Sequence, residues 1–152
     1  MGSPEARIAP FEILLVEDSP GDVRLTRESF KDAKVHINLH VASDGVEAMA
    51  ILHREGKHKD VPRPDLILLD LNLPKKSGQE VLEAIKEDSA LMSIPVVILT
   101  TSASEEDVLK SYLRHANCFI TKPVDLTGFL KVVQSIDNFW LSVVKLPRDL
   151  TS

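Results

Sequence analysis

Two short apolar runs that each end in carboxylates constrain the fold of this chain more than any other feature. The run ILLV at 13–16 is followed directly by Glu17 and Asp18, and the run LILL at 66–69 is followed directly by Asp70. Short apolar runs bounded by polar residues are typical of strands buried on both faces of a parallel sheet, and such sheets bind ligands at the carboxyl ends of their strands. We therefore expect these three acids to meet at one edge of a sheet.

Three carboxylates at one edge need a counter-charge. At about 4 Å and an effective dielectric constant of about 20, each pair of like charges costs on the order of 4 kcal/mol, so the cluster requires a cation or protonation. A divalent metal meets this requirement, and Mg²⁺ prefers one or two carboxylates together with water and phosphate oxygens. Asp70 is then either a metal ligand or a nucleophile that accepts a phosphoryl group, and Mg²⁺ is compatible with both roles.

Composition narrows the class of protein. The 152 residues, of which 43% are hydrophobic, predict a single domain. A net charge of −5 and a pI near 5.5 argue against a general binder of nucleic acid or of an anionic membrane. Cys118 is the single cysteine, which excludes an intramolecular disulfide and favours a cytoplasmic location; we interpret it as core filling. No apolar run approaches the roughly 20 residues of a membrane span.

Apolar segments that predict strands alternate along the chain with segments that predict helices. This alternation indicates repeated βα units, that is, an α/β fold with a parallel sheet and helices on both of its faces. The polar, Pro-containing segment 53–64 is predicted to be a long surface loop. The strands are predicted near 12–17, 37–42, 65–70, 95–100 and 117–121.

Capping residues mark where the helices begin. Ser19 and Pro20 predict the start of the first helix, which continues with the apolar residues Val23, Leu25 and Phe30. Two further starts resemble capping boxes, in which a capping residue is followed three positions later by a glutamate. They are Asp44 with Glu47 and Ser77 with Glu80, and the last two helices are predicted near 104–116 and 125–144.

Two more polar residues are expected at the edge where the acids meet. Thr100 ends the fourth predicted strand, and Lys122 ends the fifth and is followed by Pro123. A lysine ammonium can pair with phosphate oxygens as a point charge, and a threonine hydroxyl can donate to another oxygen. The predicted edge therefore carries the groups that phosphoryl chemistry needs.

The chain resembles the response-regulator receiver domain over residues 11–146. The resemblance rests on the order and spacing of the acidic pair, the strand-end aspartate, the strand-end threonine and the Lys-Pro pair. The resemblance implies a flavodoxin-like fold of five βα units with strand order 2-1-3-4-5. Segments 1–10 and 147–152 would be tails, and residues 1–3 are interpreted as the remnant of an expression tag. The run LDLNLPKKSG at 69–78, the long loop and the FWL at 139–141 resemble the small single-domain regulators paired with bacterial phytochrome kinases.

The resemblance assigns roles residue by residue. Asp70 corresponds to the phosphoacceptor, and Glu17, Asp18 and the main-chain carbonyl of Asn72 correspond to its partners in binding Mg²⁺. Glu17 stands where an aspartate is more usual in the family, so its reach to the metal is longer. Lys122 corresponds to the phosphate-binding lysine.

The remaining roles concern signalling. Thr100 corresponds to the switch hydroxyl and Phe119 to the aromatic switch residue, although Phe119 lacks the tyrosine hydroxyl, so burial alone would drive the switch. Asn72 and Ser102 occupy the positions that tune autodephosphorylation in this family. The resemblance implies a stand-alone phosphoacceptor rather than an enzyme, with a sensor histidine kinase, expected to be phytochrome-like, as its phosphoryl donor.

The output is expected to be a change of protein partner at the face built from the fourth helix, the fifth strand and the last helix. The same face could form a homodimer, although burial in the core would explain its apolar residues equally well. Neither nucleic acid nor a membrane is an expected direct partner. The apolar residues in question are Val108, Leu109, Leu113 and Trp140.

Three other functions predict sequence features that differ from those of a receiver. An aspartyl-phosphate phosphatase of the haloacid-dehalogenase type predicts a second aspartate two residues after the nucleophile, where this chain has Asn72. A docking domain that is never phosphorylated predicts loss of the acceptor or the lysine, and both are present. A flavodoxin-like cofactor binder predicts a Gly-rich loop after Val16, and none follows.

Overall fold

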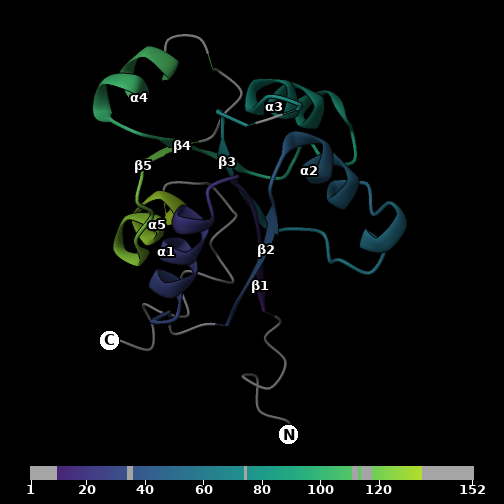
Figure 1. The fold of residues 1–152 in the computed structure, drawn as a ribbon, viewed down its shortest axis with the longest axis horizontal. Coiled ribbons are helices and arrows are strands. Elements are labelled where there is room, and N and C mark those ends of the chain that lie inside the picture. The colour runs from purple at the N-terminus through teal and green to yellow at the C-terminus, as the bar shows by residue number, and fades with distance from the viewer. Residues whose placement is uncertain (1–9, 34–35, 74, 111–112, 114–117, 135–152) are drawn as a thin grey trace, which may run out of the picture.

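One parallel sheet with helices on both faces forms the body of the molecule (Figure 1). The computed structural model describes residues 10–33, 36–73, 75–110, 113 and 118–134. The strand order is β2-β1-β3-β4-β5, as predicted. The strands are β1 (Phe11–Val16), β2 (Ile37–Ala42), β3 (Leu66–Asp70), β4 (Val96–Thr100) and β5 (Cys118–Thr121). The helices are α1 (Pro20–Phe30), α2 (Gly45–Leu52), α3 (Gly78–Glu87), α4 (Ala103–Lys110) and α5 (Leu126–Gln134), with a short 3₁₀ helix, η2 (Gly56–His58).

The helices divide into two layers because side chains alternate along each strand. In β1, Leu14 and Val16 point into the core beneath α2, α3 and α4, whereas Ile13 and Leu15 point into the core beneath α1 and α5. All four side chains are almost completely buried. Side chains on both faces of β1 are thus removed from water, and each Å² of buried apolar surface stabilises the fold by about 25 cal/mol. Burial on both faces explains why the strand sequence is continuously apolar rather than alternating.

The predicted helix caps are confirmed, with one difference. Ser77 accepts a hydrogen bond from the backbone N–H of Glu80 (3.2 Å), and the Glu80 carboxylate accepts one from the Ser77 N–H (2.9 Å), which completes a capping box. Asp44 likewise accepts from the N–H of Glu47 (2.7 Å). The Glu47 carboxylate, however, accepts from the N–H and hydroxyl of Ser43, one residue before the cap. This second motif is therefore only half of a capping box.

The buried face of α1 differs from the apolar positions named in its sequence. Phe30 is buried and Val23 packs against the core, but Leu25 is 54% exposed and Thr26 is 3% exposed. At 3.6 residues per turn, a helix that buries positions 23 and 30 also buries 26 and turns 25 outward. Thr26 tolerates burial because its hydroxyl donates to the carbonyl of Asp22 (2.9 Å).

Several predicted boundaries differ from the observed ones. The segment 53–64 contains η2 and is otherwise a loop, as expected. The fourth predicted helix begins at Ala103, one residue early, and is described as helix only to Lys110. The last predicted helix is described from Leu126 to Gln134, so Trp140 and the rest of 135–144 lie outside the described residues. Among the helices that are described, none is long and apolar enough to span a bilayer.

Gly78 lets α3 begin in direct contact with the end of β3. Its N–H donates to the carbonyl of Leu71 (3.2 Å). A Cβ added at Gly78 would collide with the Cα of Leu71 and would lie 2.5 Å from the carbonyl oxygen of Asp70. Both of these neighbours are backbone, which cannot turn away, so position 78 requires glycine for space.

We expect Gly78→Ala to lower the free energy of unfolding by about 1–3 kcal/mol, because the new methyl group forces the backbone after β3 to shift. Urea denaturation measures this change. The matched control is Gly21→Ala in α1, where the nearest atom to an added Cβ is the Ser19 hydroxyl oxygen at 3.9 Å. That variant should be neutral or slightly stabilising, since alanine has the higher helix propensity. Equal effects at the two positions would contradict the argument.

Candidate functional site

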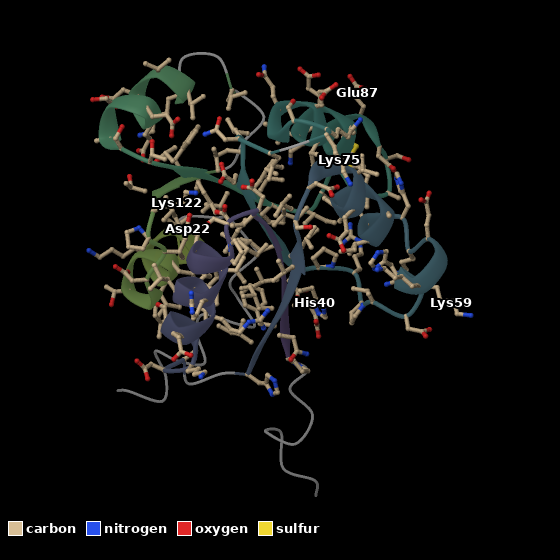
Figure 2. The ribbon with its side chains drawn as sticks, in the orientation of Figure 1. Asp22, His40, Lys59, Lys75, Glu87 and Lys122 are labelled. Carbon is tan, nitrogen blue, oxygen red and sulfur yellow. The ribbon has the colours of Figure 1, made fainter. Side chains whose placement is uncertain are left out.

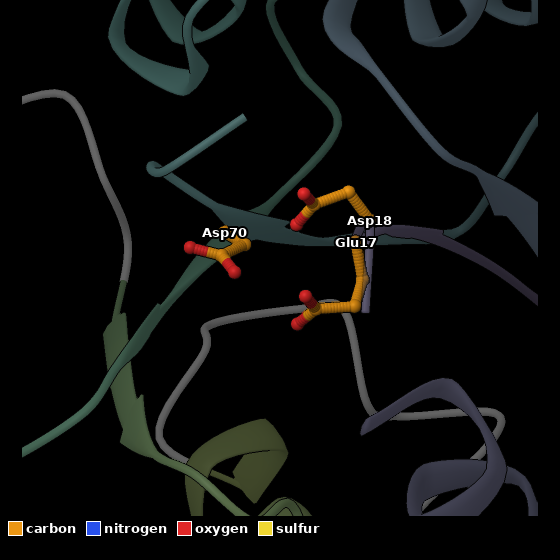
Figure 3. Close-up of side chains that lie close together, drawn as sticks. All are labelled: Glu17, Asp18 and Asp70. Atoms are coloured by element: carbon orange, nitrogen blue, oxygen red, sulfur yellow. The ribbon is translucent and has the colours of Figure 1, made fainter. Parts of the chain in front are cut away.

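Strand register brings the predicted acids to one edge of the sheet. Val16 pairs with Leu69, so Glu17 emerges from β1 beside Asp70 at the end of β3. Figure 3 shows the side chains of Glu17, Asp18 and Asp70 turned toward the same space. Each offers a carboxylate oxygen, and the three oxygens lie within 4.8 Å of one another. The predicted convergence of three acids is thus observed.

These acids differ in their exposure to water. Glu17 is 2% exposed and Asp70 is 4% exposed, whereas Asp18 faces solvent. Buried carboxylates are costly unless they are paired or hydrogen-bonded. Asp70 receives one such bond locally, since its Oδ1 accepts from the backbone N–H of Asn72 (2.9 Å). The loop that follows β3 therefore helps to fix the carboxylate of Asp70, the last residue of that strand.

Lys122 supplies the positive charge at this edge. Its Nζ donates to Asp70 Oδ2 (2.9 Å), Glu17 Oε1 (3.1 Å) and Asp22 Oδ2 (3.1 Å). Thr100 pairs with Thr121 across β4 and β5, and the Lys122 N–H donates to the Thr100 carbonyl (2.7 Å), which places the lysine just beyond the strand ends. The structure thus brings the predicted lysine into contact with both buried acids.

Asp22 is a site residue that the sequence reasoning missed. Sequence alone presented it as an acid in the first turn of a helix, a common position that needs no functional explanation. The available signal was its place in the chain: α1 begins just after Glu17, so its first turn lies at the same edge. Asp22 is the third carboxylate bound to the Lys122 ammonium.

The environment shifts two of these pKa values. Burial raises the pKa of Glu17 from 4.5 to about 7; the Lys122 hydrogen bond opposes this shift and the charge of Asp70 adds to it. Burial acts to lower the pKa of Lys122, but its hydrogen bonds to Asp70, Glu17 and Asp22 outweigh burial and raise that pKa above its usual range. Lys122 therefore stays charged at neutral pH, whereas the pKa of Glu17 lies close to neutrality.

Thr100 lies at the predicted edge, but its hydroxyl faces β5. The Thr100 side chain is completely buried, and its Oγ1 lies 3.4 Å from both the carbonyl of Ile120 and the hydroxyl of Thr121. Phe119 is half-buried and packs against the core beneath α4, with the Lys110 ammonium 6.0 Å from its ring centre. These two candidate switch residues thus share the β4–β5 side of the site.

Asn72 and Ser102, the two predicted tuning positions, lie on separate loops. Asn72 is exposed on the loop after β3. Ser102 is exposed before α4, where its hydroxyl accepts from the N–H of Glu105 (3.1 Å) and its carbonyl accepts from the N–H of Glu106 (3.1 Å). The observed contacts of Ser102 are therefore those of a helix cap.

The donor set fits a hard divalent cation. Oxygen ligands suit Mg²⁺, Ca²⁺ and Mn²⁺, and Mg²⁺ in particular uses few protein carboxylates and keeps water in its other positions. Glu17, Asp18 and Asp70 supply three oxygens within 4.8 Å of one another, next to solvent on the Asp18 side. The Lys122 ammonium partly neutralises two of them, Glu17 and Asp70.

Glu17 predicts a pH dependence of stability in chelator. A carboxyl whose pKa rises from 4.5 to about 7 on folding binds more protons when folded, so the free energy of unfolding falls as pH rises through that interval. Relative to Glu17→Gln, which keeps the shape and lacks the charge, the wild type should lose roughly 1–3 kcal/mol between these limits. Urea denaturation with EDTA across this pH range measures the difference. Parallel curves for the two proteins would refute the prediction.

The sequence matches a known family and two curated relatives across most of its length. Residues 13–134 match the model of the response regulator receiver domain. Response regulator Rcp1 from Synechocystis sp. is 51% identical over 138 residues, which cover 91% of this chain and 94% of Rcp1. The probable methanogenesis regulatory protein FilR2 from Methanothrix harundinacea is 37% identical over 139 residues, which cover 91% of this chain and 88% of FilR2.

Solved structures agree with this assignment. The bacteriophytochrome response regulator AtBRR superposes with a TM-score of 0.79 at 40% identity, over 87% of this chain and 96% of AtBRR. The Mn²⁺-bound form of Rcp1 gives a TM-score of 0.69 at 51% identity, over 88% and 96% of the two chains. The phosphorylated cyanobacterial phytochrome response regulator RcpA gives 0.70 at 49% identity, with the same coverage. The chain therefore belongs to the response regulator receiver domain family of two-component signalling proteins and has the flavodoxin-like receiver fold.

Proposed function

We propose that this protein is a stand-alone, cytoplasmic receiver that accepts a phosphoryl group on Asp70 from the phosphohistidine of a sensor kinase, with Mg²⁺ as its metal. One observation carries the proposal. The Lys122 ammonium lies 2.9 Å from Asp70 Oδ2, while Glu17 and Asp18 offer oxygens beside the same carboxylate. An acceptor carboxylate, a fixed cation and further metal ligands thus surround one position.

The chain's own residues would perform the transfer as follows. A carboxylate oxygen of Asp70 attacks phosphorus, the new P–O bond forms as the P–N bond to the donor imidazole breaks, and the imidazole leaves with the bonding electrons and takes up a proton. Lys122 pairs with the phosphoryl oxygens, and the backbone N–H of Asn72 holds Asp70 Oδ1. A metal held by Glu17, Asp18, Asp70 and the Asn72 carbonyl would supply positive charge that stabilises the transferring group.

We propose that phosphorylation then acts on Thr100 and Phe119. The phosphoryl group carries about two negative charges, while the acylated Asp70 carboxylate loses its own. The charged phosphoryl oxygens attract the Thr100 hydroxyl away from Ile120 and Thr121 on β5. Phe119 moves into the vacated space, and the face formed by α4, β5 and α5 changes for its partners. Asn72, whose backbone N–H donates to Asp70, and Ser102, two residues after Thr100, would tune how fast phosphate is lost.

The proposed phosphoryl donor is a phytochrome-like histidine kinase. This rests on similarity to the phytochrome response regulators, since RcpA and AtBRR are 49% and 40% identical to this chain. For a homodimer through the face formed by α4, β5 and α5, the structure leaves fewer exposed apolar residues than the sequence suggested. Of the four apolar residues named for this contact, Leu109 and Leu113 are buried in the core and Trp140 lies outside the described residues. Val108, which is 57% exposed, is the one of these four that the structure leaves accessible.

Acetyl phosphate tests the acceptor directly. Intact-mass analysis should find one phosphoryl adduct on the wild type in Mg²⁺, and neither in EDTA nor on Asp70→Asn, because the carboxylate and the metal are both required. Asp60→Asn, an exposed loop substitution of the same kind, should behave like the wild type. An adduct on Asp70→Asn would assign the acceptor elsewhere.

Two results would replace the proposal with an alternative function. Failure of the wild type to acquire phosphate from any donor would favour a docking module that is never phosphorylated. Repeated turnover of a generic phosphomonoester would favour a phosphatase, although Asn72 stands where that enzyme class has its second aspartate.

Metal binding gives a separate prediction. Asp18→Asn should weaken Mg²⁺ or Mn²⁺ binding at least about tenfold, which corresponds to about 1.4 kcal/mol, because a charged oxygen ligand is lost. Isothermal titration calorimetry with Mg²⁺, or the paramagnetic resonance signal of free Mn²⁺, measures the affinity. Because Asp18 is exposed and has no part in the Lys122 contacts, stability without metal should change little. Unchanged affinity would remove Asp18 from the ligand set.

A further inference from the structure

We propose that Asp22 is a positioning residue for phosphoryl transfer: it holds the Lys122 ammonium in place while metal and phosphate engage the other carboxylates bound to that ammonium. The inference rests on the proposed function and deepens it, because it adds a residue that the receiver resemblance did not assign. It requires that Asp22 act through Lys122 and make no contact with the metal.

The geometry of the Lys122 ammonium supports this role. A lysine ammonium has three N–H donors, and Lys122 directs them to Asp70, Glu17 and Asp22 at 2.9, 3.1 and 3.1 Å. The three acceptors come from different segments: the end of β3, the loop after β1 and the first turn of α1. Figure 2 shows Asp22 and Lys122 beside each other where α1 approaches the end of β5. All three donors of the lysine are thus used in this state.

The three carboxylates bound to Lys122 differ in their further roles. Glu17 and Asp70 belong to the acidic cluster that can hold a metal ion, whereas Asp22 is absent from that cluster among the described residues. When metal and phosphate occupy the site, oxygens of Glu17 and Asp70 turn to them. Asp22 is then the carboxylate left to retain Lys122.

The backbone of Asp22 is fixed independently of its side chain. Its N–H donates to the Ser19 hydroxyl that caps α1 (3.3 Å), and its carbonyl accepts from the Thr26 hydroxyl (2.9 Å). The carboxylate therefore projects from a rigid helical turn. A substitution at the side chain leaves both backbone contacts in place, so it tests the carboxylate rather than the helix.

Lysine needs such an anchor because its side chain is long and flexible. Its four-carbon stem has many rotamers, and a point charge offers no preferred direction. With Asp22 as a fixed acceptor, the N–H now directed at Asp70 can turn to a phosphoryl oxygen while the ammonium stays in position. Without it, the ammonium in a loaded site is held by the phosphoryl group alone, and positioning errors near 1 Å slow reactions severely.

The test compares Asp22→Ala with Asp22→Asn. In saturating Mg²⁺ and acetyl phosphate, Asp22→Ala should be phosphorylated at least about fivefold more slowly than the wild type, and Asp22→Asn should recover most of the rate because its amide oxygen still accepts a hydrogen bond. The Mg²⁺ affinity of both variants should stay within about twofold of the wild type. Glu28→Gln on the same helix, whose carboxylate pairs with Lys31 at the surface, is the matched control and should not alter the rate.

A second readout does not depend on phosphate. The ¹⁵N-resolved NMR signal of the Lys122 ammonium, assigned by its loss in Lys122→Ala, should persist in Mg²⁺-loaded wild type and Asp22→Asn and broaden in Asp22→Ala. An unchanged rate and signal in Asp22→Ala would overturn the inference, as would a faster rate, which would mean that Asp22 withholds the lysine. If the wild type takes up no phosphate, the proposed function fails, and the ammonium signal still decides whether Asp22 holds Lys122.

Discussion

The charge balance between one lysine and the acids at the carboxyl edge of the sheet is the interaction on which the rest of this structure depends. Asp70 and Glu17 are almost completely buried, and a buried carboxylate is tolerated only with compensation. Lys122 provides it from the end of β5, and in doing so joins β5 to β3, to the loop after β1 and to α1. A metal bound by Glu17, Asp18 and Asp70 would take over part of that compensation, so the residues that stabilise this edge of the sheet are also those suited to its chemistry.

The loop that borders the site is held from two directions. Gly78 brings α3 against the backbone of Asp70 and Leu71, and Lys75 reaches across to Asp44, the cap of α2, with 3.3 Å between its Nζ and Asp44 Oδ2. Lys75 itself adopts a left-handed backbone conformation with φ of 64°, which a non-glycine residue rarely does. The position of the Asn72 loop is therefore set jointly by α2 and α3.

Much of the fold and site could be predicted because the signals were local. Buried strands are continuously apolar, so the strand-end positions of Asp70, Thr100 and Lys122 could be read directly from the sequence. The features that the sequence could not predict depend on tertiary contacts. Asp22 looks like an ordinary helix-start acid until β5 is placed beside α1, and the direction of the Thr100 hydroxyl depends on acceptors twenty residues away. The exposure of Leu25 followed from which side of α1 meets the sheet, a choice that tertiary packing makes.

The contacts of Thr100 have a consequence for the unphosphorylated protein. Its hydroxyl has two acceptors on β5, both at 3.4 Å, well beyond the usual 2.7–2.8 Å for such bonds. These hydrogen bonds therefore add little to the packing that holds the rotamer of this buried side chain. An alternative rotamer a few kcal/mol higher in free energy is adopted by about 0.1–10% of molecules. On the proposed mechanism, some molecules would therefore carry the active arrangement before any signal arrives. The strength of these two long contacts would then influence both the signalling output of the protein before phosphorylation and the free energy needed to shift it to the active arrangement.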